Sequence, residues 1–305
     1  MKVGLTIEKD VHERIERELK NYDLKFNTFI NRLIESSEDL VPAYSEIDKD
    51  KRKNKTVNVL INKRNKRKWN NIINEQKDRH QSEILRGYIV SYLSKPLNIR
   101  ELIIFNSTVR DIKNAIFNKS SLKIKYLKDA KGEYRIVEPY RIKTTPKEEY
   151  NYLVAYCKKK KDFRSFRISR ILEVKASKSE LEQKNNGILK RVDKYFDAFL
   201  SYDEYVKIKF NDDGLKSLKK ITLNRPLEVD KKTVYKNKEI NKILKLDETE
   251  LKDIHIKVFE CTEAQAEVYF FQFLEKVLIM SPKSLKDTME LRLKKAIGLI
   301  DELDN

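Results

Sequence analysis

Glycine and proline are scarce in this sequence, whose 305 residues include six of each. So few leave little room for long flexible linkers, and six glycines could hardly build a glycine-rich phosphate-binding loop. No stretch approaches the ~20 apolar residues that a membrane-spanning helix needs. The opening residues MKVGLTIEKD also lack the apolar core of a secretion signal. We therefore expect a cytoplasmic protein with no membrane partner.

Cysteine and histidine are rare as well. Cys157 and Cys261 stand far apart in apolar surroundings, which favours buried thiols over a disulfide or a metal site. His12, His80 and His255 are scattered, with no acidic neighbours at metal-ligand spacing. Nor can a nucleophile be paired with a base. We expect no catalytic residue, no metal and no cofactor, and hence a protein that is not an enzyme.

Charge, in contrast, is abundant, and the positive charge is concentrated in the middle of the chain. The formal net charge is +18. Residues 51–100 hold 14 Lys and Arg against 3 Asp and Glu, and residues 101–180 hold 20 against 10. Residues 1–50 hold 8 against 12, and residues 181–305 hold 24 against 23. Solubility would not need this segregation, whereas a polyanionic partner would use it.

The N-terminal third contains one pattern twice. A shift of 54 residues superposes the alternating apolar residues Val3, Leu5 and Ile7 on Val57, Val59 and Ile61. Each alternating segment predicts a half-buried strand, and helical spacings follow it twice. This order resembles the ribbon-helix-helix fold, whose paired strands read a DNA major groove. Because one short strand needs a partner, we expect units of about 1–40 and 55–98 to pair within residues 1–100.

The second copy is strongly basic. Its strand would turn Thr56, Asn58 and Leu60 outward, and the following helix start carries five cations: Lys63, Arg64, Lys66, Arg67 and Lys68. We predict phosphate contacts from these cations and a base contact from Asn58; an ordinary solvated face is the alternative. The first copy instead carries Glu13, Glu16 and Glu18. Symmetric operator recognition is therefore not expected, and a structural or protein-docking role stays open.

Residues 101–180 predict a short helix followed by several strands, a spacing typical of a small barrel. The segment contains, in order, Ala115-Ile116, Tyr126, Gly132, Arg135 with Pro139, Tyr152-Leu153, Arg164, Phe166, Arg167 and Arg170-Ile171. In this order and spacing it resembles the WYL domain, a compact barrel of the Sm/SH3 type. It departs from the family at the signature Trp, which is Asn151 here.

The resemblance implies a ligand groove formed by Tyr152, Arg135, Arg164, Arg167 and Arg170. Guanidinium groups clamp phosphates and stack on bases, and a Tyr ring accepts a base without demanding a sequence. For Arg135 and Arg170, internal salt bridges to nearby glutamates (Glu133, Glu138 or Glu173) are the alternative.

Residues 195–305 predict an α/β domain that ends in a long helix. Strands are expected at 205–210 and 254–259 and helices at 213–221 and 263–277, with a final helix from Pro282 to about Leu303. The order resembles the ferredoxin-like extension that often follows WYL barrels. Its near-neutral charge and the apolar stripe of its last helix favour dimerisation, so we expect a homodimer.

The whole chain is thus expected to be α+β: tandem ribbon-helix-helix, WYL barrel and α/β extension. That order resembles the WYL accessory proteins encoded beside type VI-D CRISPR effectors. The resemblance implies single-stranded RNA binding and modulation of an RNA-targeting CRISPR effector nuclease. One alternative is a ligand-responsive transcriptional regulator that binds double-stranded DNA through the ribbon-helix-helix. A second alternative is an adaptor whose basic face docks an acidic protein.

Overall fold

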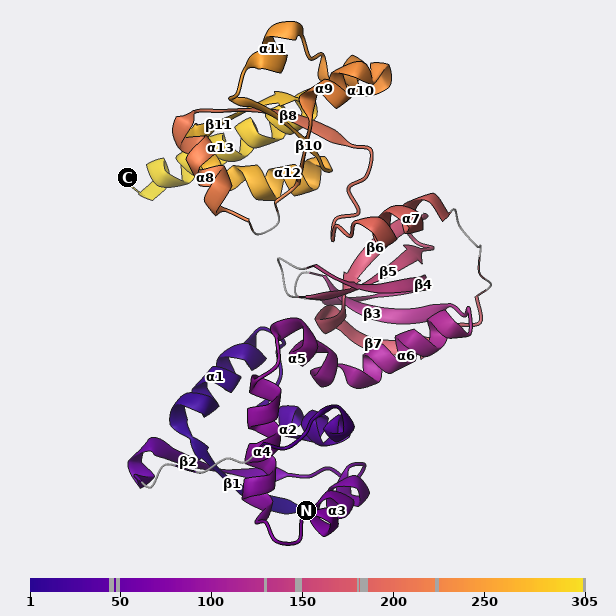
Figure 1. Ribbon diagram of the computed structural model, residues 1–305, viewed down its shortest axis with the longest axis vertical. Coiled ribbons are helices and arrows are strands. Elements are labelled where there is room, and N and C mark those ends of the chain that lie inside the picture. Colours follow the sequence, from indigo (N-terminus) through magenta and orange to yellow (C-terminus); the bar gives the residue numbers. More distant parts are fainter. Residues whose placement is uncertain are drawn as a thin grey trace. The chain divides into compact units, whose positions relative to one another are not determined.

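The fold is α+β, as predicted (Figure 1). The computed structural model describes residues 1–303 except 44–46, 48, 49, 129, 130, 146–149, 180, 182–185, 223 and 224. The chain divides into two compact units: unit 1 is Met1–Thr144 with Glu149–Lys184, and unit 2 is the remainder. Within the described residues, no helix combines the length and apolar character needed to cross a membrane.

The first 93 residues form a two-stranded ribbon with two helices after each strand, here called the ribbon module. Its elements are β1 (Lys2–Glu8), α1 (Lys9–Lys20), α2 (Phe26–Glu35), β2 (Asn54–Leu60), α3 (Lys66–Glu75) and α4 (Gln81–Leu93), with short 3-10 helices η1 (Ser37–Asp39) and η2 (Lys51–Lys53). β1 and β2 pair antiparallel, with Gly4 opposite Asn58. The predicted pairing of the two copies within one chain is confirmed.

The inward face of the ribbon builds the core of this module. Val3, Leu5 and Ile7 are buried on β1, since alternate residues of a strand point to one face. Trp69 of α3 is fully buried in the same hydrophobic core. An ion pair between buried Glu18 of α1 and buried Arg100 joins the module to the next helix of the chain.

The rest of unit 1 is a five-stranded antiparallel sheet with two leading helices, α5 (Leu97–Ile104) and α6 (Asn106–Phe117). The strands are β3 (Leu122–Lys128), β4 (Lys131–Thr144), β5 (Asn151–Cys157), β6 (Asp162–Arg167) and β7 (Ile171–Ala176). α6 buries Val109, Ile112 and Ala115 in a core that is continuous with that of the ribbon module. This shared core explains why both regions fall in one compact unit.

The five-stranded sheet is not the closed barrel that we expected. The strand order is β6-β5-β4-β3-β7, so β6 and β7 are its two edges. Alternation over residues 164–171 favours one last strand, but the segment forms two strands separated by a 3-10 turn, η3 (Ile168–Arg170). The turn is needed because β6 pairs with β5 while β7 pairs with β3 at the opposite edge. Pro139, which has no N–H to give, lies at a register shift of β4.

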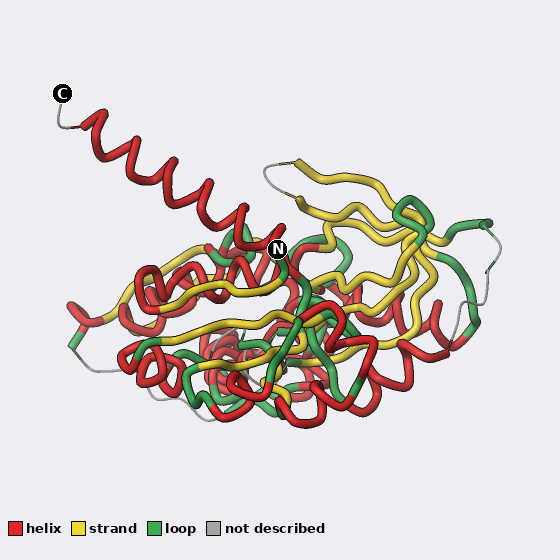
Figure 2. The backbone as a smooth tube through the Cα atoms, turned by 90° about the horizontal axis from the view of Figure 1, so that it is seen from above, coloured by secondary structure: helices red, strands yellow, loops and turns green. Residues whose placement is uncertain are grey.

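Unit 2 has a four-stranded antiparallel sheet of order β11-β8-β10-β9. Its elements are α7 (Asn186–Lys194), β8 (Tyr205–Phe210), α8 (Asp212–Lys220), β9 (Leu227–Val229), α9 (Lys231–Lys236), α10 (Lys238–Leu244), α11 (Glu248–Lys252), β10 (Ile256–Glu260), α12 (Glu263–Phe270), η4 (Phe271–Lys276), β11 (Val277–Ser281) and α13 (Lys283–Leu303). The strands and helices follow the order strand-helix-strand-strand-helix-strand, with three further short helices between β9 and β10. Figure 2 shows α13 as an unbroken coil leading to the C-terminus.

One predicted helix of unit 2 is too long. We expected a helix over 263–277, but α12 ends at Phe270 and the chain turns through η4, where Leu274 has a φ of 47°. Phe270 and Phe273 are both fully buried in the same core. The turn then directs Val277 into β11, which pairs with β8. The need to bury the aromatic cluster and complete the sheet therefore overrides helical periodicity.

Candidate nucleic-acid interface

The outward face of the ribbon presents Asn58. Thr56, Asn58 and Leu60 are all exposed, as predicted. Gly4 lies opposite Asn58, and a Cβ added to it would meet nothing within 4 Å, so this part of the face is open. The Thr56 hydroxyl is hydrogen-bonded to that of Thr6 at 3.1 Å, whereas the Asn58 amide has no side-chain hydrogen bond to a described residue. Asn58 is therefore exposed on an open part of the ribbon face.

The five predicted cations next to β2 divide into two groups. Lys68 Nζ donates to Glu38 at 3.0 Å and to the Glu35 carbonyl at 2.8 Å, and Arg64 Nε lies 4.0 Å from the Glu35 carboxylate. The other three form no ion pair with described residues and are exposed: Lys63, Lys66 and Arg67.

Two of these exposed cations lie in the first turn of α3. The helix dipole disfavours positive charge at that end, so Lys66 and Arg67 do not stabilise the helix that carries them.

Tyr152 is in the centre of a row that crosses three strands of the five-stranded sheet. It lies opposite Lys143 of β4 and opposite Arg167 of β6. Residues directly opposite one another project from the same face, so the ring is flanked by two cations. The Arg167 guanidinium carbon lies 3.2 Å from the centre of the Tyr150 ring, and Arg167 Nε donates to Ser169 Oγ at 2.9 Å. This pairing holds an oriented, stacked guanidinium beside Tyr152, with 16% of the Arg167 side chain exposed.

The other predicted arginines do not join this row. Arg135 is buried and donates to Glu133 at 2.8 Å, which matches the internal salt bridge left open by the sequence. A hydrogen bond from Lys159 and the charge of Arg135 lower the pKa of Glu133.

Arg164 and Arg167 are three residues apart on β6, and alternation places them on opposite faces. Arg164 is half-exposed and lies 3.2 Å from Asp162. Arg170 is exposed on η3 and forms no ion pair with described residues. Of the predicted groove residues, the structure thus brings together Tyr152 and Arg167.

A buried carboxylate behind this row was not predicted from the sequence. Glu101 of α5 is fully buried and accepts hydrogen bonds from the Asn151 N–H at 2.7 Å, the Asn151 amide at 2.9 Å and the Ser169 N–H at 3.2 Å. Arg167 Nε lies 3.9 Å from it. Asn151, the residue at the family's Trp position, thus joins the sheet to α5. The only sequence signal was that departure.

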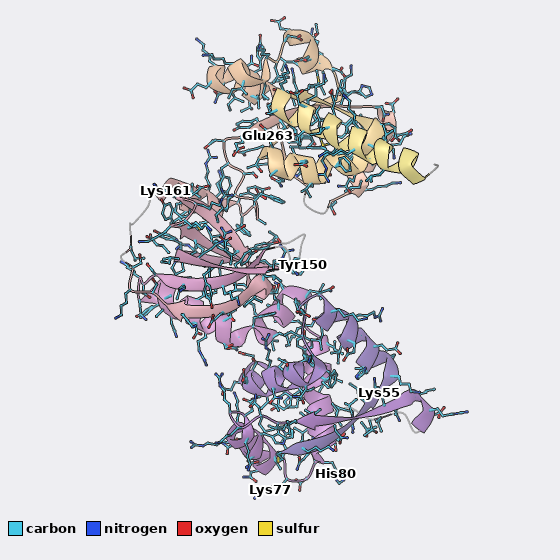
Figure 3. All side chains as sticks on the ribbon, turned by 180° about the vertical axis from the view of Figure 1, so that it is seen from behind. Lys55, Lys77, His80, Tyr150, Lys161 and Glu263 are labelled. Atoms are coloured by element: carbon cyan, nitrogen blue, oxygen red, sulfur yellow. The ribbon has the colours of Figure 1, made fainter. Side chains whose placement is uncertain are left out.

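A second unpredicted feature is the turn between β5 and β6, which is four consecutive lysines, Lys158 to Lys161. Lys158 and Lys159 are held by Glu138 and Glu133. Lys160 and Lys161 are exposed and form no ion pair with described residues. Figure 3 shows Lys161 and Tyr150 at opposite ends of the five-stranded sheet. The run KKKK was visible in the sequence, but its place at the other end of β5 from Tyr152 was not.

The two cysteines lie in the interior of the protein. Cys157 and Cys261 are free and buried, which confirms the expected thiols, and burial raises the pKa of Cys261. Across the described part of the chain, no three His, Cys, Asp or Glu side chains gather as metal ligands.

Comparisons with known proteins agree with part of this picture. Residues 107–176 match the WYL domain family, so the predicted WYL domain is confirmed. The fold is similar to the crystal structure of a CRISPR Cas-related protein, with a TM-score of 0.65, 17% identity, and coverage of 99% of this chain and 95% of that one. A weaker likeness (TM-score 0.29, 13% identity) covers 83% of this chain and 38% of proteasome accessory factor B/C (PafBC) of Arthrobacter aurescens. No curated protein matches the sequence.

Proposed function

We propose that this chain, which contains a WYL domain at residues 107–176, is a non-enzymatic regulator that binds single-stranded RNA. The observation that carries the proposal is the row Lys143, Tyr152 and Arg167, in which Arg167 is stacked on Tyr150. Arg170, Lys160 and Lys161 add exposed positive charge in the same domain.

The chemistry of the row fits unpaired nucleotides better than a duplex. Bases of a single strand are free to stack on Tyr or on a guanidinium plane, whereas bases of a duplex present only their edges. Lys143 and Arg167 on either side of Tyr152 would hold the phosphates that flank a stacked base.

We further propose that the RNA-bound protein modulates a type VI-D CRISPR RNA-targeting effector. Two features support this role: the order of ribbon module, WYL domain and α/β extension, and the fold shared with a CRISPR Cas-related protein. Adding the purified protein to such an effector should change the rate of target RNA cleavage, and an Arg167→Ala variant should have less effect.

Binding of labelled single-stranded RNA and duplex DNA, measured across a range of salt concentrations, tests the proposal. RNA affinity should exceed DNA affinity and fall steeply as salt rises. Arg167→Lys keeps the charge and loses the stack, so it should weaken RNA binding roughly tenfold. Arg164→Lys, on the opposite face of the same strand, is the matched control. Equal effects of the two substitutions would contradict the proposal.

A second candidate function is double-stranded DNA binding through the ribbon module, with the WYL domain sensing a ligand. The open face at Asn58 favours it, as do Lys63, Lys66 and Arg67, which are exposed and form no ion pair with described residues. In that case Asn58→Ala and Lys63→Ala should weaken duplex binding, while Arg167→Lys should not.

We also propose that the chain forms a homodimer and that its parts are a ribbon-helix-helix pair, an Sm-like core and a ferredoxin-like extension. The twofold strand-helix-helix order supports the ribbon-helix-helix, the five-stranded sheet supports an Sm-like core, and the order β11-β8-β10-β9 supports the ferredoxin-like extension. Leu291, Ile297 and Leu299 leave apolar surface exposed on α13. Light scattering of wild type and of Ile297→Glu tests whether α13 joins two copies.

A further inference from the structure

A groove between α5 and α6 in unit 1 is separate from both surfaces described above. Its volume is about 690 Å³, and one face of α6 from Asn106 to Asn114 forms one wall. Eight residues of helical rise span about 12 Å, the length of two helical turns. The groove is therefore long enough to hold side chains from two successive turns of a docked helix.

Positive charge surrounds this groove. Lys95, Arg110 and Lys113 line it, are exposed, and form no ion pair with described residues. Asp39 is the one acidic residue among the described residues that line it, and it accepts a hydrogen bond from Asn106 at 2.8 Å. A partner entering the groove would meet three uncompensated cations.

The floor of the groove is aliphatic. Ile99 is 38% exposed, and Leu102 beside it is partly exposed. None of the described residues that line the groove is aromatic, so they offer a nucleotide base no stacking platform. An aliphatic floor with a cationic rim instead matches a helix that carries apolar residues on one side and carboxylates beside them.

We propose that the α5–α6 groove docks an acidic amphipathic helix of a partner protein. Apolar side chains spaced by three and four residues would cover Ile99 and Leu102. Acidic side chains on both flanks would pair with Lys95, Arg110 and Lys113. The site gives the chain a protein-binding surface that does not depend on RNA binding.

A labelled peptide of about 16 residues, long enough to form a helix, is the probe. It carries Leu at helical spacing with Glu on both flanks, and a peptide of the same composition with scrambled spacing is its control. Anisotropy measures its affinity for the full chain and for Lys95→Ser/Arg110→Ser/Lys113→Ser. The matched variant is Lys63→Ser/Lys66→Ser/Arg67→Ser, which loses equal charge from the ribbon module. Single-stranded RNA is titrated against each protein in parallel.

The groove triple variant should bind the peptide roughly tenfold more weakly, as expected for three exposed ion pairs. Ile99→Ser should weaken binding by several-fold, and the matched triple by less than twofold. Equal losses in both triples, or equal binding of the scrambled peptide, would show non-specific charge attraction and overturn the proposal. A groove variant that loses RNA but not peptide would assign the groove to RNA. If wild type binds peptide but no RNA, the proposed function fails and this site stands.

Discussion

Glu101→Gln should destabilise unit 1 although it changes neither the size nor the shape of the side chain. One carboxylate oxygen of Glu101 accepts two hydrogen bonds from Asn151, and the other accepts one from Ser169. A glutamine has only one acceptor oxygen. If that oxygen faces Asn151, the new NH2 group faces the Ser169 N–H, and neither donor then has an acceptor.

The expected cost follows from these contacts. A hydrogen bond to a charged acceptor contributes about 1.5–3 kcal/mol, and an unsatisfied buried donor costs about 1–3 kcal/mol. The substitution also removes the negative charge that lies 3.9 Å from Arg167 Nε. Because these terms overlap, we expect a loss of about 3 kcal/mol in the free energy of unfolding.

Urea denaturation followed by tryptophan fluorescence measures this loss directly. Trp69 is the single tryptophan and is buried in unit 1, so its emission reports the unit that contains Glu101. Glu38→Gln is the control, because Glu38 is 87% exposed and its one ion pair with a described residue is that with Lys68; it should cost far less. If Glu101→Gln shifts the urea midpoint no more than Glu38→Gln does, the hydrogen bonds of Glu101 do not stabilise unit 1 as argued.

Three further predictions use other parts of the chain. Lys66→Ala and Arg67→Ala should each raise stability by about 0.5 kcal/mol in the same denaturation assay, because they remove cations from the positive end of the α3 dipole, and both should weaken nucleic-acid binding; lower stability would contradict this. Gly87→Ala should be destabilising by about 1–3 kcal/mol, because its Cβ would lie 2.6 Å from the Ala43 carbonyl, whereas Gly4→Ala meets nothing within 4 Å and should not lower the urea midpoint. A hydrogen bond to Asp212 raises the pKa of His255 from its ordinary 6.5, so this contribution to stability is complete below that value and is lost as pH rises through the raised pKa. Calorimetric unfolding of the full chain should show this pH dependence for unit 2 in wild type but not in His255→Gln. Identical stability–pH profiles for the two proteins would rule out the contribution of His255.

Most of the element order could be predicted because strand and helix periods depend on neighbours along the chain. Val3, Leu5 and Ile7 indicated β1, and residues 205–210 indicated β8. Prediction failed where distant contacts decide the local conformation. The chain leaves the helix after Phe270 because an aromatic cluster must be buried and β11 must pair with β8. Likewise, η3 exists because β6 and β7 pair with different strands.

The candidate site was only partly predictable for the same reason. The motif order was sufficient to identify the WYL domain, since sequence families conserve spacing, and the clustered cations indicated a polyanionic partner. Which arginines can bind a ligand depends on the face of the strand from which each projects and on ion-pair partners that are distant in sequence. Alternation along β6 separates Arg164 from Arg167, and Glu133 engages Arg135 inside the sheet. Glu101, 50 residues before Asn151 in the chain, supports the row that carries Tyr152.

The amino-acid sequence by itself therefore determined the charge distribution, the internal repeat and the WYL motif, all of which are properties of residue type and spacing. Only the tertiary structure decided which cations are free and which are paired, and which lie beside Tyr152. It alone revealed the aliphatic, cation-rimmed groove between α5 and α6. The physical reason is that a charge interacts through space over a few ångströms, and folding brings together groups that the chain keeps far apart.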